Sequence, residues 1–219
     1  MESESDLRGR KQTYDMGEVN EARRPSELEA GQRLQDIAIQ LIDARGIEAL
    51  YDQILDAVLA ILNSDFASLQ MFYPARGSGG ELRLLGQRGF SAEAARRWEW
   101  VLPTTRTTCG EALRTRQRVA IEDVRNCDFM AGSEDLDGYL NAGIQAGQST
   151  PLASRSGALL GMVSTYWRNP HRLSLAELRA LDVLARLAAD VIEHSRGEEA
   201  LRRSEDRFSR VMNNMAEGL

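Results

Sequence analysis

The sequence predicts an α+β domain in which an antiparallel sheet packs against long helices. Two pairs of segments have the patterns of strands, and each pair is joined by a short connection that contains glycine, as in antiparallel hairpins. Amphipathic helical patterns precede the first pair and follow the second. Because an amphipathic helix must bury its apolar face, we expect these helices to cover the sheet.

The N-terminal part of the chain predicts a lead-in segment and two helices. Residues 1–25 are rich in charge and poor in branched apolar side chains, so we expect them to be flexible. Ser26 and Glu29 have the spacing of a capping box, which opens a helix. Gly46 ends that helix, and residues 47–62 form a second amphipathic one.

The first hairpin is predicted over residues 66–90. In FASLQMFY the apolar side chains of Ala67, Leu69 and Met71 alternate onto one side, as in a half-buried strand. The segment ARGSGG has the composition of a loop, and LRLLGQRGF fits the partner strand. SAEAARRWEW then returns to a helical pattern.

A short helix is predicted in TTCGEALRT, residues 107–115. Thr108 and Glu111 have the T-x-x-E spacing of a capping box, so we expect Thr108 to be the N-cap and Cys109 to lie in the first turn. Residues 119–121 fit a short strand. The acidic, turn-rich stretch that follows predicts a loop with a short helix.

The second hairpin is formed by GIQAGQSTPL and ALLGMVSTYW, joined through SRSG. Both alternating sets of the second arm are largely apolar, which predicts a central strand that is covered on both faces.

A long C-terminal helix follows a further capping box, formed by Ser174 and Glu177. Its apolar residues continue in alternating steps of three and four, as in a coiled-coil seam. The pattern allows a parallel helical homodimer or, as the alternative, a frayed tail. The seam residues that we expect in the dimer are Leu187, Val191, Leu201 and Phe208.

Composition restricts the class of function. The net charge of −6 and the pI of about 5.1 disfavour a nucleic-acid binder, which needs a positive surface. No apolar run is long enough to span a bilayer, the N-terminus lacks the order of a secretory signal, and two cysteines form no disulfide framework. We therefore expect a cytoplasmic protein without membrane insertion.

Two stretches carry a resemblance to a known family. TTCGEALRTRQRVAIEDVRN, together with the region from AGIQAGQSTPL to VIEHS, resembles the GAF domain of bacterial sensor histidine kinases. The resemblance covers residues 34–195, and we place the domain at residues 26–195. It implies a sheet of about six strands, with the N- and C-terminal helices on one face and loops and short helices on the other. EEALRRSEDRFSRVMNNMAEGL is similar to the linker helix and first turn of a PAS domain, which we place at residues 196–219.

This resemblance implies a sensory input module of a two-component signalling protein. Such a module binds a small ligand, or relays a conformational change through a helical dimer, and acts on a downstream PAS domain and a histidine kinase. The chain resembles neither a phospho-acceptor motif nor an ATP-binding motif, so we expect no catalytic residues in it. Two alternatives stay open: a redox enzyme or thiol sensor that uses Cys109, similar to free methionine sulfoxide reductases, and a dimerisation spacer without a ligand.

The resemblance also implies a ligand cavity between the sheet and the distal loops. The residues that we expect to line it are Met71, Cys109, Gln148, Thr150 and Met162. Gln148 and Thr150 are polar groups on an otherwise apolar side of a strand. Hydrogen bonds to neighbouring backbone would also explain them.

Cys109 allows two interpretations. The dipole at the N-terminus of a helix favours a thiolate, but a buried cysteine commonly acts as a small apolar side chain. Gly110 stands where bilin-binding relatives commonly have histidine. A haem-binding relative needs an axial histidine, but His171 lies in a loop before a helix and His194 lies on the helix seam, so neither is a convincing ligand. We therefore expect no bilin, haem or metal, and an unidentified small molecule stays the candidate ligand.

Overall fold

The structure of the protein, a computed structural model, describes residues 47–217, with the side chains of the last helix described up to His194 and at a few positions beyond. The expected lead-in, the Ser26 capping box and the helix that ends at Gly46 lie outside these residues. In the part of the chain that is described, no helix is long and apolar enough to cross a membrane.

The strands form a single antiparallel sheet that is flanked by helices. The elements follow one another as α2 (Ile47–Leu62), β1 (Phe66–Tyr73), β2 (Glu81–Arg88), α3 (Ala92–Arg97), β3 (Trp100–Val101), α4 (Thr108–Thr115), β4 (Val119–Ile121), the 3-10 helix η1 (Val124–Asn126), α5 (Glu134–Asn141), β5 (Ala146–Ala153), β6 (Leu159–Trp167) and α6 (Leu175–Glu217). The strand order is β3-β2-β1-β6-β5-β4. The six-stranded antiparallel sheet and the central place of the second hairpin are therefore confirmed.

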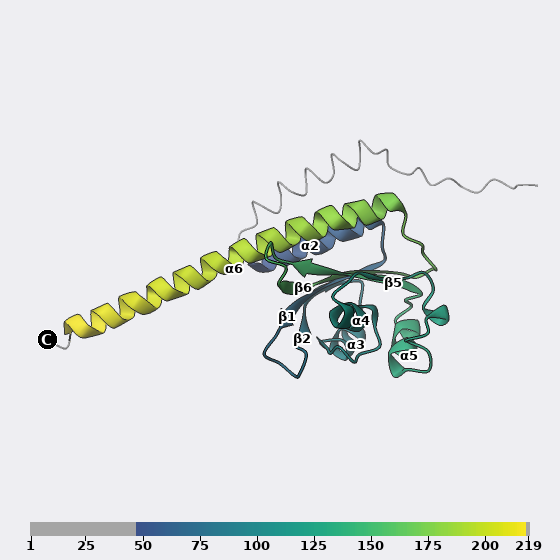
Figure 1. The fold of residues 1–219 in the computed structure, drawn as a ribbon, viewed down its shortest axis with the longest axis horizontal. Coiled ribbons are helices and arrows are strands. Elements are labelled where there is room, and N and C mark those ends of the chain that lie inside the picture. Colours follow the sequence, from purple (N-terminus) through teal and green to yellow (C-terminus); the bar gives the residue numbers. More distant parts are fainter. Residues whose placement is uncertain (1–46, 218–219) are drawn as a thin grey trace, which may run out of the picture.

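Helices cover both faces of this sheet (Figure 1). α2 and α6 lie side by side on one face, and α3, α4 and α5 lie on the other. The core under α2 and α6 includes Leu50, Ile54, Leu55, Val58, Leu69, Met71, Val163, Leu184, Ala188 and Ile192. The core on the α4 side includes Phe66, Leu82, Trp98, Leu113, Met130, Tyr139, Ile144, Met162 and Tyr166. The predicted arrangement of layers is confirmed within the described residues.

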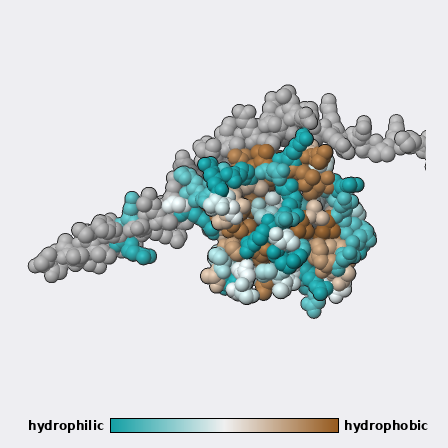
Figure 2. All heavy atoms as spheres, viewed as in Figure 1, coloured by the Kyte–Doolittle hydropathy of each residue, from teal (hydrophilic) through white to brown (hydrophobic). Residues whose placement is uncertain are grey.

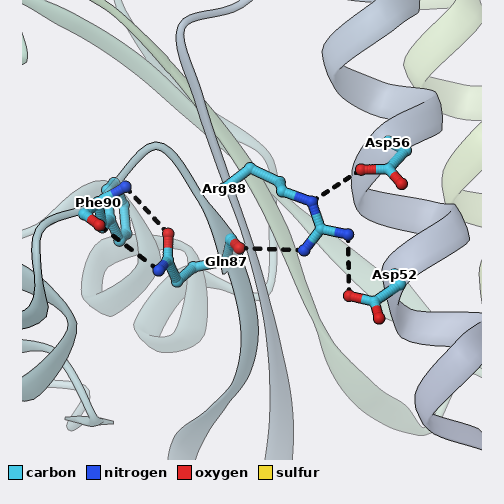
Figure 3. Close-up of polar contacts among 5 residues, drawn as sticks. All are labelled: Asp52, Asp56, Gln87, Arg88 and Phe90. Carbon is cyan, nitrogen blue, oxygen red and sulfur yellow. Dashed lines mark hydrogen bonds and ion pairs between the residues drawn. The ribbon is translucent and has the colours of Figure 1, made fainter.

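A single arginine ties α2 to the end of β2 (Figure 3). Arg88 donates from Nε to Asp56 Oδ1 at 2.8 Å and from Nη2 to Asp52 Oδ1 at 2.9 Å. The two carboxylates lie one turn apart on the helix, so one guanidinium can bind both. The hydrogen bond to Asp56 contributes most to raising the pKa of Arg88. On the adjoining turn, Gln87 Oε1 accepts from the N–H of Phe90 at 2.9 Å, which fixes the turn that leads towards α3.

The capping box at the start of α6 is confirmed. The N–H of Glu177 donates to Ser174 Oγ at 3.2 Å, and the N–H of Ser174 donates to Glu177 Oε2 at 2.7 Å. Two orphan donors of the helix start are satisfied by this exchange. The start of the longest helix is thus set by four consecutive residues.

The predicted cap of α4 was wrong. Its N-cap is Thr107, whose Oγ1 accepts from the N–H of Gly110 at 3.1 Å. Thr108 is instead fully buried, and Glu111 pairs with an arginine one turn on. Cys109 does lie in the first turn of the helix. The register of the cap differs by one residue because the Thr108 hydroxyl is engaged in the protein interior.

Candidate functional site

An enclosed cavity lies between α4 and the face of the sheet beneath it. It is lined by Ser68, Gln70, Leu84, Phe90, Trp98, Val101, Thr107, Cys109, Tyr139 and Tyr166. The cavity leaves about 10 Å³ open to the centre of a water molecule, which is room for about one water. None of these lining residues is charged, and the wall of the cavity is mostly apolar with a few polar groups.

Buried hydroxyls join α4 to the sheet beside the cavity. Ser149 Oγ of β5 donates to Thr108 Oγ1 at 2.8 Å and lies 2.8 Å from Ser164 Oγ of β6. The Tyr139 hydroxyl of α5 lies 3.2 Å from Thr108 Oγ1 and accepts from the N–H of Thr108 at 3.3 Å. Because all four residues are buried, each hydroxyl depends on the partners that it has here. This network holds α4 in place over the strands.

The Cys109 thiol belongs to the same polar cluster. Its Sγ lies 3.1 Å from the Tyr166 hydroxyl and 3.6 Å from Ser164 Oγ, and the residue is 4% exposed. A thiol in this position acts as a small packing group with weak hydrogen bonds. Burial raises the pKa of the other free cysteine, Cys127, which is only partly exposed. The geometry favours the structural interpretation of Cys109, since a reactive thiol needs access.

Burial raises the pKa of both cavity tyrosines above the ordinary range. For Tyr166 and Tyr139 the loss of hydration is the largest cause, and each phenol also lies near a second ionisable group. Both effects oppose formation of a phenolate. At neutral pH the two hydroxyls are therefore protonated and available as hydrogen-bond donors.

These two tyrosines predict a loss of stability at alkaline pH. Because their pKa values are raised in the folded state, their contribution is complete below about pH 10, the value for the unfolded chain, and is lost as the pH rises above it. We expect a loss of about 1.4 kcal/mol per tyrosine at pH 11. The free energy of unfolding in urea, measured between pH 8 and pH 11, tests this. Tyr139→Phe and Tyr166→Phe should each make the fall shallower, and an unchanged slope in both variants would contradict the assignment.

One buried polar atom of the cavity has no partner among the described residues. Gln70 Oε1, on β1, is buried and receives no hydrogen bond from the described residues, and the residue is 2% exposed. A buried acceptor left unpaired costs about 1–3 kcal/mol. This acceptor is the clearest chemical sign of a binding site in the cavity.

The structure separates the five residues that were expected to line a ligand cavity. Cys109 lines it, and Met162 belongs to the core on the same face of the sheet. Met71 packs under α2 and α6 on the opposite face. Gln148 and Thr150 also point to that opposite face, because successive residues of a strand alternate between the two layers. The cavity therefore brings together only part of the predicted set.

The residues that complete the site were not predicted. Among them are Gln70, Tyr139 and Tyr166 in the lining, and Ser149 and Ser164 in the network beside it. A signal for Gln70 was present in FASLQMFY, where polar residues alternate with apolar ones in a strand flanked by long helices. Polar side chains that point into a covered face must find partners inside the protein.

A second polar network lies on the opposite face of β5 and β6, against α6. Arg118, which directly precedes β4, donates from Nε to Thr150 Oγ1 at 2.8 Å and from Nη2 to Asp182 Oδ1 at 2.6 Å. Thr150 donates to Gln148 Oε1 at 2.7 Å, and Gln148 Nε2 donates to Thr165 Oγ1 at 3.1 Å. Gln148 and Thr150 are thus paired with neighbouring side chains. Hydrogen bonds to backbone were the alternative to a ligand that was predicted from the sequence.

An open groove of about 590 Å³ lies beside β4 and the loop before α6. Several of its polar side chains already have partners: Glu122 lies 3.1 Å from Arg172, and His171 Nε2 lies 3.0 Å from Glu177 Oε1. The His171 ring also stacks on a tryptophan. Among the described residues, no group of His, Cys, Asp and Glu side chains is placed to hold a metal ion. The groove therefore offers a ligand fewer buried unpaired polar groups than the enclosed cavity, where Gln70 Oε1 has no partner among the described residues.

Known proteins share this architecture. The family model for the GAF domain matches residues 44–193. A methyl sulfide methyltransferase-associated sensor of Methanosarcina acetivorans is 29% identical over 112 residues, which are 51% of this chain. The match spans 11% of the length of that sensor.

Two solved structures are similar in fold. A domain assigned to a two-component sensor histidine kinase of Sinorhizobium meliloti 1021 is 28% identical with a TM-score of 0.59, and the match covers 72% of this chain and 98% of that domain. Free methionine-R-sulfoxide reductase of Neisseria meningitidis is 17% identical with a TM-score of 0.62, over 80% of this chain and 95% of the reductase. The second likeness shows the fold alone. Since the family match covers well over half of the chain and includes the whole sheet, the chain belongs to the GAF domain family.

Proposed function

We propose that this GAF domain is a sensory input module that takes a small molecule into the cavity and transmits its presence through α6. Two of its relatives are named as sensors or as part of a sensor kinase. The observation that carries the proposal is that β5 takes part in two polar networks at once. One network joins it to α4 beside the cavity, and the other joins it to α6 on the opposite face.

Neighbouring residues of β5 connect the two faces. Ser149 points to the cavity side and donates to Thr108 of α4. Thr150 points to the opposite face, which α2 and α6 cover, and accepts from Arg118. Arg118 also donates to Asp182 of α6. Arg118 also follows α4 closely in the chain, which gives α4 a covalent route to the same contact. A displacement of α4 therefore changes the geometry around Asp182.

The cavity ties ligand entry to such a displacement. Its walls leave room for about one water molecule, so a larger molecule has to part them. α4 contributes Cys109 to the lining and holds the adjoining hydroxyl network. Binding then favours a state in which α4 has moved, which is the difference in affinity between two states that a sensor requires.

The redox alternative finds less support in the geometry. The solved reductase is too distant in sequence for its activity to be inferred for this chain, and the likeness shows the fold alone. Neither Cys109 nor Cys127 is an exposed thiol. The spacer alternative differs from the sensor in one measurable respect, because a spacer needs no energetic coupling between α4 and α6.

A double-mutant cycle measures that coupling. Thr108→Val removes the α4 hydroxyl, and Asp182→Asn weakens the ion pair on α6, although the two residues lie on opposite faces of the sheet. We expect their effects on the free energy of unfolding in urea to deviate from additivity by about 0.5 kcal/mol or more.

The matched control uses Asp190, which is also on α6 but pairs with Arg155 of the turn between β5 and β6. Thr108→Val combined with Asp190→Asn should be additive within about 0.3 kcal/mol. Additivity of both pairs would remove the proposed route through Arg118 and would favour the spacer.

We also propose that the module is a homodimer, joined through the N- and C-terminal helices, and precedes a PAS domain and a histidine kinase. In support, α6 continues past the domain to Glu217, and its C-terminal half projects from the sheet as a single helix (Figure 1). Most of the stability of a helix in a protein comes from the packing of its apolar face, which a partner helix would supply here. The sequence similarity of residues 196–219 to a PAS linker agrees with this direction of output.

The described part of α6 shows how the seam begins. Leu187 and Val191 are partly buried against the core of their own domain, so only part of each side chain is open to a partner helix. Figure 2 shows apolar patches along the layer formed by α2 and α6. Leu175 and Val183 of α6 are among the large apolar side chains that are exposed. The remaining seam side chains, such as Leu201, lie outside the described ones.

A further inference from the structure

We infer that the ligand of the cavity is a small uncharged molecule that donates a hydrogen bond to Gln70 Oε1. This inference rests on the proposed function and adds the chemical class of the ligand to it. Three properties of the cavity lead to it: the absence of charge from its lining, the direction of its unmet hydrogen bond, and its aromatic walls.

The lining disfavours a charged ligand. None of the cavity residues is Asp, Glu, Lys, Arg or His, and burial keeps both cavity phenols protonated. Asp135 of α5 approaches the site from outside, but one of its oxygens accepts from Trp98 Nε1 at 3.4 Å and the other from the N–H of Arg106 at 3.0 Å. An ion in this cavity loses its hydration without gaining a counter-charge.

The unmet hydrogen bond has a direction. Gln70 Oε1 can only accept, and none of the described residues donates to it. The neighbouring Tyr166 hydroxyl and Cys109 thiol already pair with each other at 3.1 Å. A ligand that donates satisfies Gln70, whereas a ligand that only accepts leaves its carbonyl buried and unpaired.

The walls around Gln70 favour a flat apolar body. Ring centroids are separated by 5.8 Å for Phe90 and Trp98, 5.2 Å for Trp98 and Tyr139, and 5.7 Å for Tyr139 and Tyr166. The same four rings line the cavity and make its wall mostly apolar, so a small ring can pack against them. The ligand class is therefore an uncharged molecule with an apolar body and an N–H or O–H group.

Pyrrole and furan test the class on the whole chain. They are uncharged five-membered rings of similar size, and only pyrrole has an N–H group. In titrations followed by NMR chemical shifts, we expect the wild-type protein to bind pyrrole about tenfold more tightly than furan. Gln70→Leu should bring this ratio close to one, and it should fold, because it removes an unpaired buried acceptor. Gln148→Leu is the matched control, since Gln148 is a buried glutamine that faces the other layer of the sheet, and it should keep the preference.

Several outcomes would overturn the inference: equal binding of the two rings, binding of neither ring, or a preference that survives Gln70→Leu. Binding of pyrrolidine, which is a cation at neutral pH, at least as tight as that of pyrrole would overturn the uncharged class. The double-mutant cycle between Thr108 and Asp182 uses no ligand. Its failure therefore removes the proposed route to α6, whereas failure of the pyrrole preference removes only the ligand class.

Discussion

Alanine at position 110 will destabilise the domain by about 3 kcal/mol or more, although it replaces a glycine inside a helix. Its Cβ would overlap with the carbonyl oxygen of Thr105 and would lie 3.1 Å from that of Leu102. Both are backbone atoms, so no side-chain rotation can relieve the contact. The usual gain of about 1 kcal/mol for replacing a helical glycine by alanine is smaller than this cost. α4 has to move away from the preceding loop, and Cys109 moves with it.

Gly197 of α6 provides the matched control for Gly110. A Cβ at this position meets nothing within 4 Å, so Gly197→Ala should stabilise the helix by about 0.5–1 kcal/mol. Urea unfolding followed by tryptophan fluorescence and circular dichroism measures both variants. If Gly110→Ala is as stable as the wild type, α4 is not seated against the loop as the structure has it.

Most of the fold was predictable because its signals are local. The alternation in FASLQMFY and the capping box of Ser174 and Glu177 depend on residues close in sequence, and each led to the observed element. β3, Trp100–Val101, was not predicted, because a strand of two residues has no periodicity to detect. It is defined by its pairing with Leu82 and Arg83 of β2, which is a long-range property.

The cap of α4 shows how a tertiary contact can override a local motif. Thr107 and Thr108 are adjacent hydroxyl residues, and only Thr108 has a glutamate at the capping-box spacing. The buried hydroxyls of Tyr139 and Ser149 nevertheless bind Thr108, so Thr107 is left to cap the helix. Neither partner is near α4 in the sequence, which is why the spacing alone chose the wrong threonine.

The site was less predictable than the fold for a related reason. In a strand covered on both faces, alternation groups the residues into two sets but does not tell which set faces the cavity. Gln148 and Thr150 were expected on the cavity side. Gln148 instead binds Thr165, and Thr150 binds Arg118, on the face that α2 and α6 cover. Which set faces the cavity depends on which helices cover each face of the sheet. That is decided by contacts between segments that are distant in the sequence.

Glutamate at position 201 will dissociate the proposed homodimer. The heptad pattern places Leu201 on the seam between Val191 and Phe208, and a two-fold interface brings the same position of both chains together. Two carboxylates in an apolar seam lose hydration and repel each other. We expect the dissociation constant to rise about 100-fold or more, which corresponds to about 2.7 kcal/mol.

Sedimentation equilibrium over a range of concentrations measures this change on the whole chain. Arg203→Glu is the control, because position 203 lies off the seam and also receives a glutamate. It should leave the dissociation constant within about threefold of the wild type, since surface charges contribute little. A wild-type chain that sediments as a monomer, or equal dissociation of both variants, would contradict the dimer. The domain of Leu201→Glu should stay folded, because the described core residues under α2 and α6 extend along α6 only as far as Ile192. Loss of the dimer can therefore be distinguished from loss of the fold by circular dichroism.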